Sequence, residues 1–258
     1  MNPDKKVILI VVDGMRPDAM TSCGEPFTSE MQKKAQYSMA CRTVFPSLTL
    51  PCHISLFYSV PPERHGTTTN QYAPMVHPMD GLVSVIRNAG ARSAMFYGWE
   101  QLRDIARPGD MMLTEYRRIG SFPDTDDYFT EQAVRCASDQ KVPFIFLYLG
   151  ETDEVGHKYG WMSPEYLQTV GNAIRNVRKV LEALAPEYDV IVTADHGGHD
   201  RSHGTLMEED MTIPLFCFGE EFCPGAVFQN ASILDVAPTI AKIMGLPADE
   251  DWEGKALF

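Results

Sequence analysis

The stretch "VILIVVDG", residues 7–14, decides the fold because it places six consecutive apolar residues directly before an aspartate. A run that is apolar at every position is typical of a central parallel strand that helices cover on both faces. Similar runs recur along the chain, so we expect several strands. The segments predicted as strands are 7–12, 41–45, 91–97, 143–150, 189–195 and 213–219.

Amphipathic segments of helix length alternate with these strands. They cover 131–140, 163–185 and 232–245. The second opens with Ser163 as the expected N-cap and Pro164 at the first helical position. Strands that alternate with helices imply a parallel sheet with helices on both faces. The predicted fold class is therefore α/β, a three-layer α/β/α sandwich with a mostly parallel central sheet.

Two stretches, 60–80 and 98–127, follow neither pattern because both are rich in proline, glycine and polar residues. We interpret both as loops, with a small loop or cap segment near 98–127, inside a single domain that spans residues 1–258. Long loops in a compact α/β chain often carry function.

The charge and composition of the chain disfavour several classes of partner and metal site. With 35 acidic and 22 basic residues, the chain carries a formal charge of −13, which disfavours a nucleic-acid polymer or an anionic membrane surface as partner. The N-terminal region lacks the long apolar stretch of a signal peptide, and no apolar run approaches the ~20 residues of a membrane helix. The six cysteines form no CxxC pair, so no thiolate zinc site is indicated. These features predict a cytoplasmic protein with reduced thiols.

Acidic residues and histidines follow three of the predicted strands. They are Asp13 after the first strand, Asp153 and His157 after the strand at 143–150, and Asp195, His196 and His203 at or after the end of the strand at 189–195. Such residues taken singly are usually helix caps or loop residues. The carboxyl ends of parallel strands, however, meet at one edge of a sheet, where three carboxylates repel one another unless positive charge lies between them. Mixed carboxylate and imidazole ligands suit zinc, with manganese or iron as alternatives.

Thr49 lies in "FPSLTLPCH", residues 45–53, between a predicted strand and a predicted helix that has Pro51 close to its first position. The simple interpretation makes Thr49 the N-cap of that helix. The functional one makes its hydroxyl a nucleophile activated by a divalent ion, at a helix N-terminus that favours a phosphate or sulfate. The local sequence leaves both open.

The chain resembles the alkaline phosphatase superfamily, and within it the nucleotide pyrophosphatase/phosphodiesterase branch. The resemblance runs from Asp13 to about Leu246 and rests on "VVDG", "PSLTLPCH", "ERHGTTTN", "ETDEVGHKYG", "ADHGGHDRSHG" and "SILDVAPTIAKIMGL". It implies an alkaline-phosphatase-like fold with two divalent metal ions, most simply zinc. One ion would be held by Asp153, His157 and His203, and the other by Asp13, Asp195 and His196, with Thr49 beside the second ion as a ligand and as the nucleophile.

The resemblance also assigns substrate-binding positions. Asn70 would donate a hydrogen bond to a phosphoryl oxygen, and Leu50 stands where the nucleotide-cleaving branch has an aromatic residue, which leaves a nucleotide substrate open. His203 is preferred to His199 as the third histidine, and His53 is either a partner of the metal ligands or a residue of the helix face. Arg103, Arg107, Arg117 and Arg118 are candidates for binding extra negative charge, or else belong to a solvated loop.

The expected function is a two-metal hydrolase of small-molecule phosphate esters, of the phosphodiesterase or nucleotide pyrophosphatase type, that acts through a phospho-threonine at Thr49. The alternatives are a phosphomonoesterase, a sulfatase or a phosphomutase on the same fold, or a metal-binding protein without catalysis. Sulfatases carry a C/S-x-P-x-R string at the nucleophile, which "FPSLTLPCH" lacks.

Overall fold

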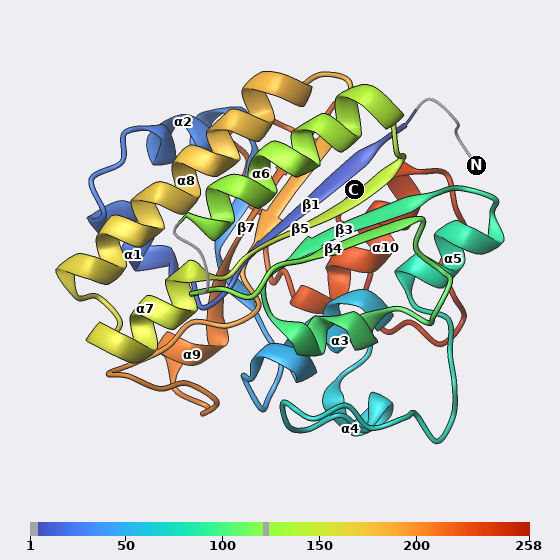
Figure 1. Cartoon of the computed structure of the whole chain (residues 1–258), viewed down its shortest axis with the longest axis horizontal. Helices are drawn as coiled ribbons and strands as arrows, with labels where there is room; N and C mark the ends of the chain where they lie inside the picture. Colours follow the sequence, from blue (N-terminus) through green and yellow to red (C-terminus); the bar gives the residue numbers. More distant parts are fainter. Residues whose placement is uncertain (1–4, 121–123) are drawn as a thin grey trace.

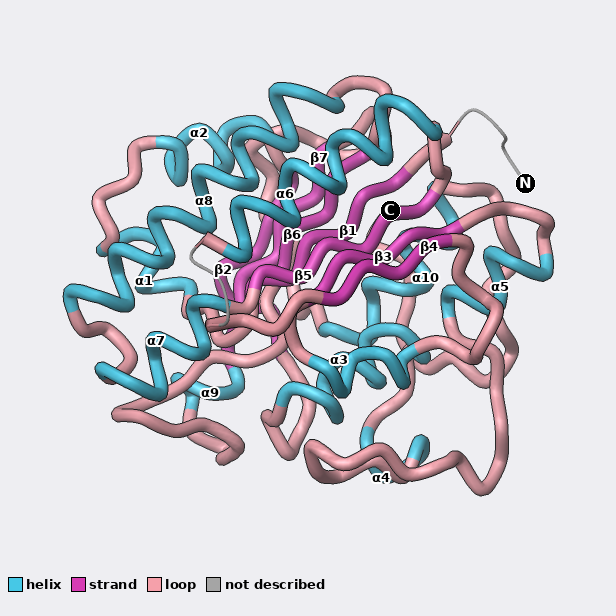
Figure 2. Tube along the Cα trace, viewed as in Figure 1, coloured by secondary structure: helices cyan, strands magenta, loops and turns pink. Residues whose placement is uncertain are grey.

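A computed structural model of the chain describes residues 5–120 and 124–258. A seven-stranded sheet forms its centre, in the order β2-β7-β6-β1-β5-β3-β4 (Figure 2). The strands are β1 (Val7–Val12), β2 (Gln36–Arg42), β3 (Ser93–Tyr97), β4 (Leu113–Tyr116), β5 (Phe144–Leu149), β6 (Asp189–Thr193) and β7 (Thr212–Phe218).

β1 lies at the centre, where the uninterrupted apolar run predicted it. It pairs in parallel with β5 on one side and with β6 on the other. β7 alone runs against its neighbours and pairs antiparallel with β6 and β2. The predicted mostly parallel sheet is therefore confirmed, and the carboxyl ends of β1, β5 and β6 lie side by side.

Helices cover both faces of this sheet (Figure 1). One layer contains α1 (Pro17–Ser22), α2 (Phe27–Lys34), α6 (Thr125–Arg135), α7 (Glu151–Tyr159) and α8 (Pro164–Leu184). The other contains α3 (Thr49–Tyr58), α4 (Pro62–His65), α5 (Leu82–Asn88) and α10 (Val236–Ile243), and the short α9 (Glu208–Met211) precedes β7. The architecture is the three-layer sandwich predicted from the alternation.

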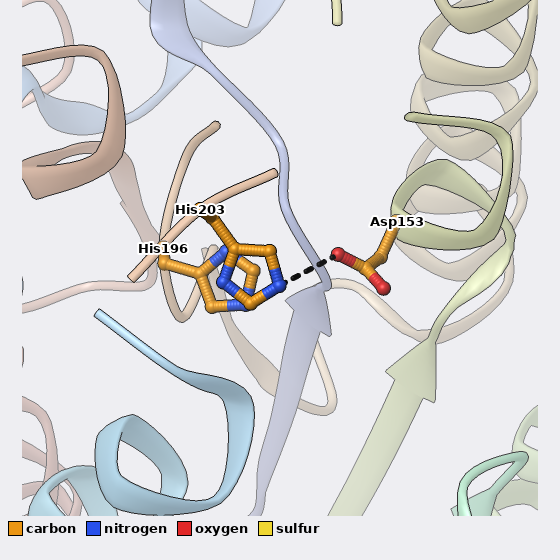
Figure 3. Close-up of side chains that lie close together, drawn as sticks. All are labelled: Asp153, His196 and His203. Carbon is orange, nitrogen blue, oxygen red and sulfur yellow. Dashed lines mark ion pairs between the residues drawn. The ribbon is translucent and has the colours of Figure 1, made fainter. Parts of the chain in front are cut away.

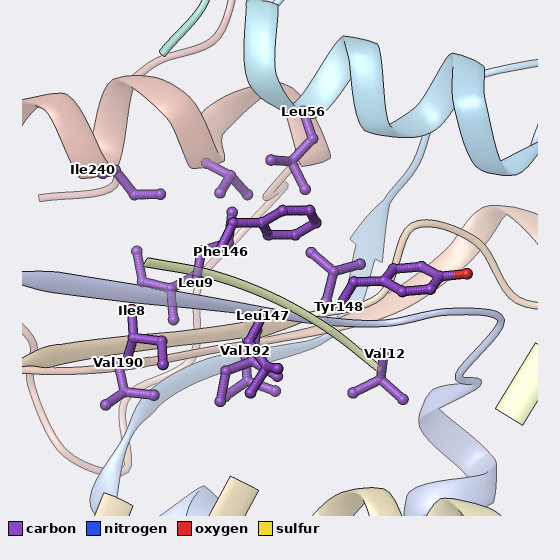
Figure 4. Close-up of a cluster of buried hydrophobic side chains, with 14 of the residues drawn as sticks. Ile8, Leu9, Val12, Leu56, Phe146, Leu147, Tyr148, Val190, Val192 and Ile240 are labelled. Carbon is purple, nitrogen blue, oxygen red and sulfur yellow. The ribbon is translucent and has the colours of Figure 1, made fainter. Parts of the chain in front are cut away.

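The core fills the space between the sheet and both helix layers, and alternate residues of one strand serve opposite sides (Figure 4). Leu9 and Phe146 meet Leu56 of α3 and Ile240 of α10, whereas Ile8 and its neighbours face the other layer. All of them are buried. Burying an aliphatic or aromatic side chain of this size stabilises a fold by roughly 1.5–3 kcal/mol, so the central strands are firmly held.

Four segments differ from the predictions. The segment 60–80, expected as loop, contains the short helix α4 (Pro62–His65). The strand expected at 41–45 is Gln36–Arg42, an edge strand whose polar, half-buried start hides the pattern. The helix expected at 131–140 begins at Thr125 and ends at Arg135, followed by a wider turn over Cys136–Gln140. Inside 98–127, expected as loop or cap, the chain forms a 3₁₀ turn, η1 (Glu100–Ile105), and the edge strand β4. Residues 121–123 of that segment lie outside the described residues.

Two local predictions at helix ends have clear outcomes. Ser163 caps α8, because its side chain accepts a hydrogen bond from the backbone N–H of Tyr166, and Pro164 is the first helical residue. Thr49 is not an N-cap, because Leu48 occupies that extended position and Thr49 is the first residue of α3. Within the described parts of the chain, every helix is too short or too polar to cross a lipid bilayer.

Candidate active site

The carboxyl ends of β1, β5 and β6 bring together the three aspartates that the sequence placed there. Asp13 directly follows β1, Asp153 lies in the first turn of α7 after β5, and Asp195 lies two residues beyond β6. All three are largely buried at one edge of the sheet. Two of the histidines predicted with them, His196 and His203, complete two overlapping groups.

The first group contains Asp13, Asp195 and His196, whose ligand-type atoms lie within 4.8 Å of one another. His196 Nε2 is 3.2 Å from Asp13 Oδ1 and 3.3 Å from Asp195 Oδ2. Its other ring nitrogen, Nδ1, is 2.8 Å from the carbonyl oxygen of Gly197 and therefore carries the proton of the neutral ring. The lone pair of Nε2 consequently faces two carboxylate oxygens, an arrangement that a cation between them would stabilise.

The second group contains Asp153, His203 and again His196 (Figure 3). His203 Nε2 is 3.6 Å from Asp153 Oδ1, and the His196 and His203 rings stack with centroids 3.8 Å apart. His157 lies outside this set of mutually close atoms, but its Nε2 is 3.4 Å from Asp153 Oδ2. It stands one helical turn after Asp153 on the exposed side of α7. The structure thus adds His196 to the trio expected around Asp153.

The three histidines are oriented alike. Nδ1 of His157 is 2.9 Å from the carbonyl oxygen of Arg201, and Nδ1 of His203 is 2.9 Å from that of Ser47. Backbone carbonyls therefore fix the proton on Nδ1 in both rings, as in His196, and leave Nε2 unprotonated toward the aspartates. In metal-binding proteins the ring N–H of a histidine ligand commonly donates to such a carbonyl oxygen, which orients the ring and leaves the other nitrogen free to bind the metal.

Burial makes this cluster unstable without positive charge. Among residues 5–120 and 124–258, no hydrogen-bond partner reaches Asp13 Oδ1, Asp153 Oδ1 or Asp195 Oδ2. Burial raises the pKa of Asp195 to about 8, and burial together with the neighbouring aspartates raises the pKa of Asp13 well above its ordinary value. Burial lowers the pKa of His196 and of His203 to about 3, which excludes imidazolium as the balancing charge. Unpaired carboxylate oxygens and neutral imidazole nitrogens are ligands that fit divalent metal ions.

Thr49 reaches the same place from the opposite helix layer. Its Oγ1 is 3.2 Å from His196 Nε2, and its side chain is buried at the first turn of α3. The hydroxyl lines a cavity of about 190 Å³ with Asp13, Asp153 and His203. The nucleophile predicted from the sequence therefore adjoins both groups of ligand-type atoms.

Asn70 lines this cavity as well, and its orientation is set by the start of α3. The backbone N–H of Leu50 donates to Asn70 Oδ1 at 3.0 Å, so the amide nitrogen of Asn70 is the group left to donate. The prediction that the Leu50 side chain binds substrate is wrong, because that side chain is fully buried in the core. Leu50 contributes through its backbone instead.

The histidines whose roles the sequence left open lie beside the cluster. His53 is buried, with Nδ1 2.8 Å from the carbonyl oxygen of Thr49 and 3.5 Å from Asp195 Oδ2. His199 points away from the cluster, because its Nδ1 is 2.7 Å from Oδ1 of the buried Asp210. Asp210 also accepts hydrogen bonds from Thr205, so this pair fastens the loop that presents His203.

Sequence reasoning missed several residues around the cavity. The hydroxyl of Tyr148 donates to Asp13 Oδ2, and Trp99, Ile119 and Glu154 complete the wall. Tyr148 stood inside an apolar run that was interpreted only as core. Its position directly before the last residue of β5, on the face that also carries Phe146, was the signal that could have marked it.

Comparison with known proteins agrees with this geometry. The family model described as type I phosphodiesterase / nucleotide pyrophosphatase matches residues 7–211. The chain belongs to this family. The family resemblance noted from the motifs is thereby confirmed, and the names of family members describe enzymes that act on phosphate esters.

Individual relatives have low sequence identity to this chain. Human ectonucleotide pyrophosphatase/phosphodiesterase family member 1 is 25% identical over 215 residues, which cover 74% of this chain and 23% of the relative. A 2,3-bisphosphoglycerate-independent phosphoglycerate mutase of Bacteroides thetaiotaomicron is 33% identical over 132 residues, which cover 50% of this chain and 26% of the relative. The chain thus spans about a quarter of the length of these curated relatives.

Solved structures share the fold. Murine ectonucleotide pyrophosphatase/phosphodiesterase 5, an inactive variant in complex with AMP, superposes with a TM-score of 0.80 at 14% identity and covers 95% of this chain and 96% of its own. A 2-O GAG sulfatase, BT1596, superposes with a TM-score of 0.76 at 15% identity and covers 98% of this chain and 73% of its own. At these identities the likeness establishes the alkaline phosphatase fold alone.

Proposed function

We propose that the chain is a two-metal phosphodiesterase that acts on small-molecule phosphate esters through a covalent phospho-threonine at Thr49. The observation that carries the proposal is the position of Thr49 Oγ1, 3.2 Å from His196 Nε2, where the two groups of ligand-type atoms meet. One ion would be held by Asp13, Asp195 and His196, and the other by Asp153, His157 and His203. When bound, the ions would acidify the Thr49 hydroxyl and neutralise charge on the phosphoryl group and the leaving oxygen. Zinc suits this mixture of oxygen and nitrogen ligands, with manganese or iron as alternatives.

The residues of the chain then perform two displacements. The Thr49 hydroxyl gives its proton to water, and Thr49 Oγ forms a bond to phosphorus while the bond from phosphorus to the leaving oxygen breaks. That oxygen takes a proton from water and departs as the alcohol. In the second step the oxygen of a water molecule bonds to phosphorus and gives up a proton to the solvent, the bond from Thr49 Oγ to phosphorus breaks, and Thr49 Oγ takes a proton back. The amide nitrogen of Asn70 donates a hydrogen bond to a phosphoryl oxygen in both steps, because Leu50 holds the amide oxygen away from the cavity.

Replacing the nucleophile tests this proposal. Thr49→Ala should lower turnover of bis(4-nitrophenyl) phosphate by at least ~10³-fold, because no other hydroxyl takes its place, while metal analysis still finds close to two ions per chain. Thr169→Ala, which removes a half-buried hydroxyl that donates to the Glu165 carbonyl oxygen within α8, is the matched control and should keep full activity. Full activity of Thr49→Ala would refute the nucleophile.

A phosphomutase is the second candidate, favoured by the 33% identity to a phosphoglycerate mutase over half of the chain. The same protein preparation should therefore be assayed for interconversion of 2- and 3-phosphoglycerate. A mono-aryl phosphate and an aryl sulfate in parallel assays separate a monoesterase and a sulfatase from the diesterase. Fastest turnover of the diester is the expected result.

A further inference from the structure

A second cavity, of about 330 Å³, adjoins the catalytic cavity and shares Trp99, Ile119 and Glu154 with it. We propose that this second cavity binds one of the two alcohol groups of the phosphodiester, and that this alcohol carries both an ammonium and a carboxylate group, as serine does. The inference rests on the proposed function, since the ester must lie with its phosphorus beside Thr49. The shared wall then directs one substituent into the second cavity.

Two unpaired charges of opposite sign distinguish this cavity. Arg118 and Glu154 both line it, and within the described chain neither side chain has a hydrogen bond or an ion pair, with each other or with another residue. The third charged residue of the wall, Glu100, is bound to Arg103 and is therefore already neutralised. The cavity thus offers one free cation and one free anion, which match the carboxylate and the ammonium of a zwitterion.

The other arginines of the same segment are engaged elsewhere. Arg103 pairs with Glu100 and Asp104, and Arg107 is 2.8 Å from Asp80. The Arg117 guanidinium lies over the Tyr128 ring, 3.5 Å from its centroid. Of the four arginines that the sequence offered for binding extra negative charge, the structure places Arg118 next to the catalytic cavity with its donors available.

The remaining wall suits a small polar substituent. Trp99 and Tyr116 supply aromatic surface, and an ammonium over an indole face gains a cation–π interaction. The volume lies at the lower end of the range of small-molecule pockets. Glu154 adjoins both cavities and directly follows Asp153, so an ammonium bound to it would lie close to the phosphoryl group, as in an ester of a 2-amino alcohol.

A matched series of substrates tests the inference. The 4-nitrophenyl phosphodiesters of serine, ethanolamine, glycolic acid and methanol share one leaving group and differ only in the charges of the retained alcohol. The kcat/KM of the serine diester should exceed that of the methyl diester by about 30-fold, because two charge-assisted contacts are added.

Replacing Arg118 and Glu154 separately tests which charged group of the substrate each residue binds. Arg118→Gln should lower the serine-to-methyl and glycolate-to-methyl ratios of kcat/KM about 10-fold and spare the ethanolamine ratio. Glu154→Gln should lower the serine and ethanolamine ratios and spare the glycolate ratio. Arg107→Gln, which removes an arginine of the same segment that is paired with Asp80 and lies outside the wall of this cavity, should change no ratio. Equal kcat/KM for the four diesters in the unaltered protein, or ratios unchanged in Arg118→Gln and Glu154→Gln, would overturn the inference.

Binding measurements test the zwitterion site independently of the proposed hydrolytic function. If no diester is hydrolysed, the proposed function is wrong, and the cavity is then judged from the Kd of O-phosphoserine and O-phosphoethanolamine, measured by calorimetry on the metal-loaded protein. Tighter binding of O-phosphoserine that is lost in Arg118→Gln supports the zwitterion site. Equal affinity for the two compounds contradicts it.

Discussion

Asp126 and Glu151 cap the first turns of each other's helices. Asp126 accepts hydrogen bonds from the backbone N–H groups of Gly150 and Glu151, at 3.0 and 3.1 Å. Glu151 Oε1 accepts in return from the N–H groups of Thr125 and Asp126, at 2.7 and 3.3 Å. Carboxylates at helix N-termini satisfy free donors and interact favourably with the helix dipole. This reciprocal pair fixes the start of α7, which presents Asp153 to the candidate metal site.

Removing Asp126 should therefore weaken metal binding as well as the fold. Asp126→Ala leaves the N–H groups of Gly150 and Glu151 at the start of α7 without their acceptor, so we expect a loss of about 1–3 kcal/mol in the free energy of unfolding of the metal-free protein. Disturbed support of Asp153 should lower metal affinity roughly 10-fold or more, read by competition with a chromogenic chelator. Asp126→Asn, which keeps one acceptor, should give intermediate losses.

The neighbouring residue offers the control for this prediction. Asp127 forms a half-exposed ion pair with Lys179 on the surface of α6 and α8. Asp127→Ala should cost less than about 1 kcal/mol and leave metal affinity unchanged. Equal metal affinity in the two alanine variants would show that the reciprocal pair does not position Asp153.

The sequence predicted the central strands because each of them is buried on both faces and therefore apolar throughout. Asp13, Asp153 and Asp195 could be placed at one edge because parallel strands align their carboxyl ends. The partnership of Asp126 and Glu151 could not be predicted, since 25 residues and a strand separate them and no local pattern links two helix starts. Contacts of this kind exist only after the sheet has brought the helices together.

The directions of the Leu50 and His199 side chains could not be predicted from the sequence either. The resemblance assigned a position to Leu50, but the direction of its side chain depends on how α3 packs on the sheet, and that packing turns it into the core. His199 and His203 are four residues apart, and the loop between them decides which ring reaches Asp153. Which ring reaches Asp153 depends on Asp210, because Asp210 binds His199 and Thr205 and so leaves His203 to face the site.

Restoring an aromatic residue at position 50 should damage the fold without improving nucleotide recognition. The Leu50 side chain has no exposed surface, so Leu50→Phe adds volume to a filled core and should cost about 1–3 kcal/mol of unfolding free energy. The ratio of kcat/KM for 4-nitrophenyl thymidine 5′-phosphate to that for bis(4-nitrophenyl) phosphate should stay the same. A rise in this ratio would show that residue 50 contacts the base after all.

His203 and His199 should respond differently to replacement. His203→Ala removes a nitrogen that lies 3.6 Å from Asp153, so metal analysis should find the loss of about one ion per chain. His199→Ala should retain both ions and instead lose about 1–3 kcal/mol of stability, because Oδ1 of the buried Asp210 loses its hydrogen-bond partner. Retained metal in His203→Ala together with loss in His199→Ala would reverse the assignment.

The acid sensitivity of the fold should depend in part on His65, which lies away from the metal ligands. The backbone N–H of Thr67 donates to its Nδ1 at 3.1 Å, and its Nε2 is 3.0 Å from Ser55 Oγ, so the ring is held neutral. Burial lowers the pKa of His65 from 6.5 to about 4. The unfolded chain therefore binds a proton between these values that the folded chain does not, and the stabilisation is complete above pH 6.5 and is lost as the pH falls toward 4. Urea unfolding of the metal-free protein at pH 7.5 and 5.0 should show a decrease in unfolding free energy that is about 2 kcal/mol smaller in His65→Gln than in the unaltered chain.

The control for this prediction is His77→Gln, a change at an exposed histidine. It should leave the decrease in unfolding free energy the same as in the unaltered chain. An equal decrease in all three proteins would exclude His65 as its source.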